Sequence, residues 1–188
     1  MAVPLRNSPT MRSVQRIIKS LGMTFFSLKV AGKTHGGFWP VHEECNVVHY
    51  PCFDGLVSGV LAWEFLEEHK NWNVGEIHPV NYTIRDTWLA SELRTPCAIV
   101  DFLYHPSAEF WADHHQTSML SRAAEADFQR RKGKACLMFD ERARSCASPL
   151  FRGLGGFLTD KPHFKEMVGW AEKIDSATLP FGKRSDPR

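Results

Sequence analysis

Hydrophobic positions in the central part of the chain fall into two kinds of run. Short, almost continuous apolar runs predict buried strands, and they occupy residues 46–50, 76–80, 96–101 and 110–113. Between and after them, apolar residues recur every three or four positions, which predicts helices over residues 56–68, 84–93, 122–146 and 162–174. Fully apolar strands that alternate with helices are typical of a parallel sheet covered on both faces. We therefore expect an α/β fold: a doubly wound, mainly parallel sheet with helices on both faces, followed by a helical C-terminal part.

The start of the chain shows a weaker pattern. It predicts a short helix over residues 12–21 and an edge strand over residues 24–30. Residues 1–41 hold six basic side chains and no acidic one, which fits a targeting segment, a loose basic arm, or sequence upstream of a start at Met11 or Met23. The expected parts of the chain are a partly structured or flexible N-terminal extension at 1–42, one domain at 43–180 and a flexible tail at 181–188.

Composition narrows the class of protein. With 188 residues, 43% of them hydrophobic, the chain can bury a core within one soluble domain without disulfides. The net charge of +2 does not by itself indicate a nucleic-acid partner. Five cysteines without a Cys-x-x-Cys pair argue against a disulfide framework or a zinc knuckle, and reduced cysteines predict a cytoplasmic protein. No run approaches the roughly 18 apolar residues of a membrane span, so no membrane partner is expected.

Polar side chains follow three of the predicted strands at the point where each strand ends. They are His49 and Asp54, then Asp101, then Asp113, His114 and His115. Because ligands of open α/β sheets bind outside the carboxyl ends of the strands, these side chains are expected at one edge. Taken singly, each has an ordinary explanation, such as Asp54 capping a helix that begins at Leu56. Together, so many charged groups are costly unless a cation compensates, and imidazole with carboxylate suits manganese, iron or zinc.

The same residues form four motifs that resemble the DHH phosphoesterases. His49-Tyr-Pro-Cys-Phe-Asp54-Gly55 resembles the first motif, and Ile99-Val100-Asp101 resembles the second. Trp111-Ala-Asp113-His114-His115 resembles the third, which names the family. Ala171-Glu-Lys-Ile-Asp175-Ser-Ala177 resembles the fourth. The family includes exonucleases, oligoribonucleases, cyclic-dinucleotide phosphodiesterases and manganese-dependent pyrophosphatases, and the resemblance spans about residues 46–177.

This resemblance implies a role for each site residue. His49 would bind a first metal ion, and Asp101 would bridge both metals. Asp54, His114 and Asp175 would hold the second metal. His115 would face the substrate phosphate as a catalytic and substrate-binding residue, and Asp113 would orient the two histidines.

Cys52 departs from the family pattern, which usually has an acidic residue at this position of the first motif. The thiol would either bind a softer metal or leave the first metal weakly held. The chain also ends soon after the fourth motif, whereas many family members carry a further C-terminal domain that grips the substrate.

The implied activity is hydrolysis of a phosphate ester, expected to be a phosphodiester of a nucleotide or short oligonucleotide. The implied cofactors are two divalent metal ions, Mn²⁺ first, with Mg²⁺, Co²⁺ or Fe²⁺ as alternatives, which activate a water molecule. A homodimer is an open alternative to a monomer. Five basic side chains within residues 122–134 could line a path for phosphates, although they are more typical of a solvated helix face because no aromatic residues interleave with them.

Two other functions stay open from the sequence. The first is a degenerate domain that binds nucleotide or metal without turnover, since Cys52 interrupts the first motif. The second is a cysteine hydrolase that pairs Cys52 with His49, although no helix N-terminus is expected immediately before the thiol to activate it.

Overall fold

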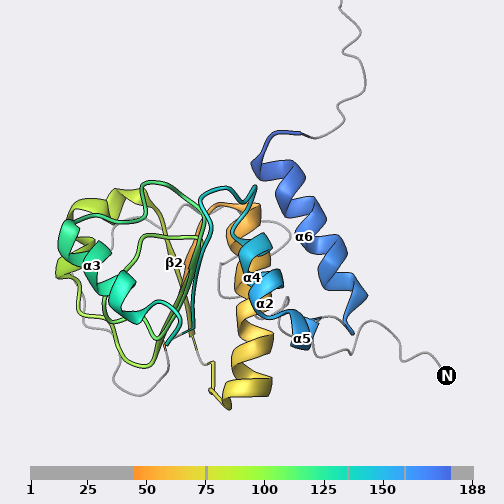
Figure 1. The fold of residues 1–188 in the computed structure, drawn as a ribbon, viewed down its shortest axis with the longest axis horizontal. Helices are drawn as coiled ribbons and strands as arrows, with labels where there is room; N and C mark the ends of the chain where they lie inside the picture. Colours follow the sequence, from red (N-terminus) through yellow and green to blue (C-terminus); the bar gives the residue numbers. More distant parts are fainter. Residues whose placement is uncertain (1–44, 75, 135, 159, 179–188) are drawn as a thin grey trace, which may run out of the picture.

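The computed structural model describes residues 45–74, 76–134, 136–158 and 160–178 (Figure 1). The helix and strand expected before residue 42, and the tail expected at 181–188, lie outside the described residues. Among the helices of the described part, none has both the length and the apolar character that crossing a membrane would require.

A five-stranded parallel sheet forms the centre of the molecule. Its strands in chain order are β1 (Cys45–His49), β2 (Glu76–Val80), β3 (Cys97–Val100), β4 (Phe110–Asp113) and β5 (Cys136–Phe139). Their order across the sheet is β2-β1-β3-β4-β5, and every neighbouring pair is parallel. The first four strands lie where the apolar runs predict them. The α/β prediction is therefore confirmed.

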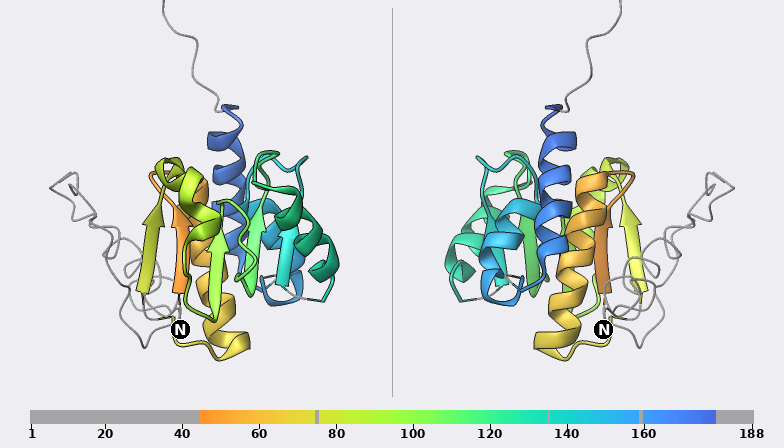
Figure 2. Two further views of the ribbon diagram at one scale, coloured as in Figure 1. Left: turned by 90° about the vertical axis from the view of Figure 1, so that its left-hand side faces the viewer. Right: turned by 90° about the vertical axis from the view of Figure 1, so that its right-hand side faces the viewer.

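Helices cover both faces of this sheet, as Figures 1 and 2 show. One face carries α2 (Phe53–Lys70), α4 (Ala147–Gly153), α5 (Gly155–Leu158) and α6 (Pro162–Asp175). The other face carries the 3₁₀ helix η2 (Tyr82–Ala90) and α3 (Arg122–Arg131). Successive strand residues point to opposite faces, so Val100 packs into the core under α2 while Ile99 packs into the core under η2 and α3.

The fifth strand corrects the prediction of continuous helix over residues 122–146. Helix α3 ends at Arg131, and Gly133 follows at φ 82, a left-handed conformation that stops a helix and suits glycine. The apolar run Cys136–Phe139 then pairs with β4 at the edge of the sheet, and Leu137 fills the core beneath α3. Pairing with a neighbouring strand overrides the local helical spacing here.

One further difference is smaller. Residues 84–93, predicted as a helix, form the 3₁₀ helix η2 at Tyr82–Ala90.

Candidate metal centre

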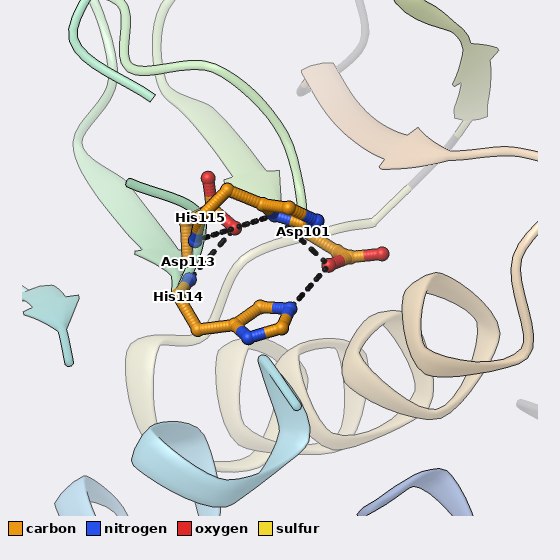
Figure 3. A group of neighbouring side chains, drawn as sticks. All are labelled: Asp101, Asp113, His114 and His115. Carbon is orange, nitrogen blue, oxygen red and sulfur yellow. Dashed lines mark hydrogen bonds and ion pairs between the residues drawn. The ribbon is translucent and has the colours of Figure 1, made fainter. Parts of the chain in front are cut away.

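Three neighbouring strands bring their carboxyl ends together at one edge of the sheet. His49 is the last residue of β1, Asp101 follows β3 directly, and Asp113 is the last residue of β4. Because β1, β3 and β4 are adjacent, the side chains that follow them meet at one place. The edge predicted from the sequence therefore exists, and Figure 3 shows part of its cluster.

Asp101 lies at the centre of this cluster. Its backbone has φ 56, in the left-handed region, which aspartate enters more readily than most residues and which often marks functional sites. The side chain is fully buried, and its Oδ2 lies 3.2 Å from Nδ1 of His49. Its Oδ1 has no hydrogen-bond partner in the described part of the chain. Burial, and then the nearby carboxylates of Asp54 and Asp113, raise the pKa of Asp101 well above its usual range.

Both carboxylate oxygens of Asp113 accept hydrogen bonds from neighbouring residues. Its Oδ1 accepts hydrogen bonds from the backbone N–H of His114 and from Nδ1 of His115, both at 2.7 Å. Its Oδ2 accepts a hydrogen bond from the hydroxyl of Ser118. This carboxylate therefore fixes the orientation of the two histidines, and its hydrogen bond raises the pKa of His115 to about 9.

His114 turns one ring nitrogen towards three carboxylates. Its Nδ1 lies 3.2 Å from the carbonyl oxygen of Ala143 and donates to it, which leaves a lone pair on Nε2 in the neutral ring. Nε2 lies 3.6 Å from Asp54 Oδ2, 3.8 Å from Asp101 Oδ1 and 3.5 Å from Asp175 Oδ2. It is buried and makes no hydrogen bond within the described residues. An imidazole nitrogen that faces three carboxylates without a hydrogen bond is an arrangement that a cation would stabilise.

Asp54 is held by the N-terminus of a different helix from its own. Helix α2 begins at Phe53, so Asp54 lies in its first turn and is not the residue that caps it. Its carboxylate instead accepts hydrogen bonds from the backbone N–H groups of Cys146 and Ala147, the latter at 3.0 Å, at the start of α4. The suggestion that Asp54 caps a helix beginning at Leu56 is therefore wrong. Burial raises the pKa of Asp54 despite these two donors.

Gly55 allows helix α2 to approach the end of β1. A Cβ atom at this position would lie 2.3 Å from the carbonyl oxygen of His49 and 3.2 Å from Oδ2 of Asp101. Only glycine tolerates so close an approach of backbone to backbone. The approach brings Cys52 and Asp54, on either side of the start of α2, to the same edge as His49.

Among the described residues, the donor atoms form three groups that could hold a cation. One of them, Asp101, Asp113, His114 and His115, contains the carboxylate of Asp113, which is already hydrogen-bonded within the protein, so the other two are the better candidates. Of these two, the first group, His49, Cys52 and Asp101, brings ligand atoms within 4.8 Å of one another, and the second group, Asp54, His114 and Asp175, does the same. Asp101 Oδ1 also lies near Nε2 of His114. Ligands that share a cation at about 2.0–2.2 Å are roughly 3.0–3.5 Å apart, so the second group needs only small adjustments.

Asp175, at the end of α6, completes the second group from the C-terminal part of the chain. Its side chain is 29% exposed, against 0% for Asp54 and 10% for His114. The second group is therefore open to solvent on the side of α6.

His49 and Cys52 differ in how burial affects them. Burial, followed by the charge of His115, lowers the pKa of His49, which favours the neutral ring that a metal ligand requires. Burial, followed by Asp101, raises the pKa of Cys52 to about 12. Cys52 occupies the N-cap position of α2, so a helix does begin directly after the thiol, contrary to the prediction. Because its pKa is raised, the thiol of the metal-free protein stays protonated. A protonated thiol argues against a cysteine nucleophile.

Two residues that the sequence did not single out also belong to the cluster. Tyr82 lies at the start of η2. The centre of its ring is 5.1 Å from that of His49 and 6.2 Å from that of His115, so the ring borders the cluster. Tyr82 follows the end of β2 and could have been found by the same strand-end rule. Ser118 holds Asp113, but a serine in a loop gives no sequence signal of its own.

The basic residues near the end of α3 lie elsewhere. Arg131 and Lys134 line a cavity of about 700 Å³ together with Thr95 and Glu109, which precede β3 and β4. These residues mark the amino edge of the sheet, at the opposite ends of the strands from the candidate metal centre. This part of the basic stretch therefore does not lead to the cluster.

Comparison of the chain with models of known protein families, with curated proteins and with solved structures finds no match.

Proposed function

We propose that this protein is a metal-dependent phosphoesterase of the DHH type. It hydrolyses a phosphate ester, in the first place a phosphodiester of a nucleotide or short oligonucleotide, with a water molecule activated by two divalent cations. The observation that carries the proposal is Nε2 of His114, buried, facing three carboxylates within 3.8 Å, and without a hydrogen bond in the described chain. The order of the four sequence motifs supports the choice of reaction.

The donor set fits the proposed cofactor. Imidazole nitrogen and carboxylate oxygen are ligands that Mn²⁺ accepts, and Asp54, His114 and Asp175 offer only these two kinds. The raised pKa values of Asp54 and Asp101 reflect carboxylates crowded together in a buried place. A pair of divalent cations would compensate that charge. Mg²⁺, Co²⁺ and Fe²⁺ remain alternatives.

Each residue then has a distinct part in the chemistry. Two bound cations would lower the pKa of a water molecule and stabilise charge on the phosphoryl oxygens. Asp101 directs one oxygen towards the group of His49 and the other towards the group of His114. Asp113 holds Nδ1 of His115, so the other ring nitrogen is left to contact a phosphoryl oxygen of the substrate.

A metal titration combined with a chromogenic phosphodiester tests this function. Calorimetry should show that the metal-free full-length protein binds Mn²⁺. The Mn²⁺-loaded protein should then hydrolyse the phosphodiester and release its chromophore. Asp101→Asn should lower the Mn²⁺-dependent rate by at least about a thousandfold, because it removes the charge shared by both groups. Glu109→Gln, which changes an exposed carboxylate at the amino edge, is the matched control and should keep the wild-type rate.

The outcomes separate the proposal from its rival. Mn²⁺ binding without turnover of any phosphodiester or phosphomonoester would favour a domain that only binds its ligand. Undiminished Mn²⁺-stimulated hydrolysis by Asp101→Asn would defeat the assignment of the site. A cytoplasmic location and a homodimer stay predictions.

A further inference from the structure

The two groups of ligand atoms differ in their chemistry. The second group, Asp54, His114 and Asp175, offers two carboxylates and an imidazole. The first group, His49, Cys52 and Asp101, offers an imidazole, a thiol and a carboxylate. Sulfur ligands favour softer cations, whereas sites rich in carboxylate suit Mn²⁺ and Mg²⁺. The two positions are therefore unequal in the metals that they select.

The backbone directs Cys52 into the first group. Tyr50 continues the pairing of β1 by donating its N–H to the carbonyl of Val80 at 2.8 Å, and the chain then turns back. Cys52 follows in an extended conformation, φ −136 and ψ 136, as the last residue before α2. The absence of a side chain at Gly55 lets the start of α2 lie close to the carbonyl of His49. The thiol and the imidazole, three residues apart, thus lie beside the same carboxylate.

Asp101 supplies an independent reason to expect a cation between them. Its carboxylate is fully buried, and Oδ1 lacks a hydrogen bond within the described residues. Oδ2 lies 3.2 Å from His49, while Oδ1 lies 3.8 Å from Nε2 of His114. A buried carboxylate with one oxygen that accepts no hydrogen bond is costly in free energy even with His115 3.9 Å away, and a cation between it and the other ligands would lower that cost.

We propose that Cys52 binds the first cation through its sulfur, so that this position selects a thiophilic metal, Zn²⁺, Co²⁺ or Fe²⁺, over Mn²⁺ and Mg²⁺. The second position keeps its preference for Mn²⁺, and the centre holds two different metals. The thiol releases its proton to solvent when the sulfur binds the cation. The inference rests on the proposed function only in assuming that the cluster binds cations.

The other cysteines with described side chains have different surroundings. Cys146 is completely buried, and its sulfur lies 3.1 Å from the carbonyl oxygen of Ala112. Cys97 is buried in the core beneath η2 and α3. Cys136, at the start of β5, is partly buried and lines the cavity at the amino edge. Cys136 is therefore a suitable control, because it is a similar thiol far from the cluster.

Absorption spectroscopy with Co²⁺ tests this ligand directly. Metal-free full-length protein, titrated with Co²⁺ without oxygen, should develop a sulfur-to-cobalt charge-transfer band in the near ultraviolet as the first position fills. Cys52→Ser should lose the band, and Cys136→Ser should keep it. Native mass spectrometry counts the bound ions, and circular dichroism checks that each variant is folded.

A competition measurement uses a second variant. Cys52→Asp replaces the sulfur by a carboxylate, so its preference for Zn²⁺ over Mn²⁺ at the first position should fall by more than about tenfold. The preference of Cys136→Ser should equal that of the wild type.

The possible results distinguish this inference from the function on which it rests. Loss of the band in Cys52→Ser, together with the changed preference of Cys52→Asp, supports sulfur ligation. Binding of Co²⁺ without the band, or a band that persists in folded Cys52→Ser, overturns it and leaves the phosphoesterase proposal standing. Wild-type protein that binds neither Co²⁺ nor Mn²⁺ overturns both.

Discussion

The two edges of the sheet differ in the burial and hydrogen bonding of their charged side chains. At the amino edge, a cavity of about 700 Å³ is lined by Lys70, Arg131 and Lys134. The guanidinium of Arg131 is satisfied, because it donates to the carbonyls of Pro106 and Ala108. At the carboxyl edge, the carboxylates of Asp54, Asp101 and Asp113 are buried and the histidines are partly buried. Oδ1 of Asp101 and Nε2 of His114 lack hydrogen bonds in the described chain. The convergence of several potential metal ligands, and not the size of a cavity, identifies the candidate site.

The carboxyl edge depends on the close approach of helix α2 to the end of β1 at Gly55. Gly55→Ala should destabilise the protein by about 1–3 kcal/mol, because the added Cβ would lie 2.3 Å from the backbone carbonyl of His49. This is opposite to the usual stabilisation of about 0.5–1 kcal/mol when alanine replaces glycine within a helix. Urea denaturation of the metal-free protein measures the change.

Gly169→Ala is the control for this substitution. Gly169 lies within α6, and a Cβ atom there would meet nothing within 4 Å. This variant should become more stable by about 0.5–1 kcal/mol. If both variants gained stability, the tight approach of α2 to β1 would be refuted.

The unmet charge at the carboxyl edge should also be visible in the pH dependence of stability. The pKa of Asp101 is raised in the folded protein, so the metal-free fold holds a proton that the unfolded chain releases, and it loses stability as pH rises from about 4. Asp101→Asn removes this titrating group, and asparagine also tolerates the left-handed backbone. At pH 7 with chelator, the variant should be more stable than the wild type by about 1–2 kcal/mol.

Two changes of condition sharpen this expectation. Near pH 4 the difference between the two proteins should shrink, because the carboxyl of the unfolded wild-type chain is then about half protonated and folding takes up little further proton. Saturating Mn²⁺ should reverse the order, because the metal stabilises only the protein that can bind it. If the metal-free wild type were more stable than Asp101→Asn at pH 7, burial of the Asp101 carboxyl would not destabilise the fold, and this explanation would be wrong.

The smallest effect is expected at the amino edge. Lys70→Ala and Lys134→Ala change two basic residues of the large cavity. If substrate binds only at the carboxyl edge, kcat/KM should change by less than about twofold, within the range of surface substitutions. A loss of tenfold or more in kcat/KM would assign substrate binding to the amino edge as well and would weaken the contrast between the two edges.

The sequence predicts which residues gather at the carboxyl edge, because these residues stand at the ends of the strands. Apolar runs closed by His49, Asp101 and Asp113 define both a strand and the residue that follows it, and parallel strands bring such residues to one edge. The same logic fails where pairing overrides local spacing, as in β5, whose residues also suit a helix.

Long-range packing accounts for what the sequence could not predict. The need for glycine at position 55 arises from a carbonyl of another element. The donors to Asp54 come from the start of α4, more than ninety positions later in the chain. Asp175 was suggested only by the fourth motif of the resemblance, because the last residue of an amphipathic helix carries no spacing signal.

The contribution of Asp175 has a consequence for how the protein matures. The second group of ligands draws its residues from α2, from the loop after β4 and from the last turn of α6. Helix α6 is the last of the described elements to be synthesised, and it carries the core residues Phe164, Val168 and Ala171 as well as Asp175. Completion of the core and completion of the proposed second cation site therefore fall at the same step of synthesis, and a product truncated before α6 would lack both.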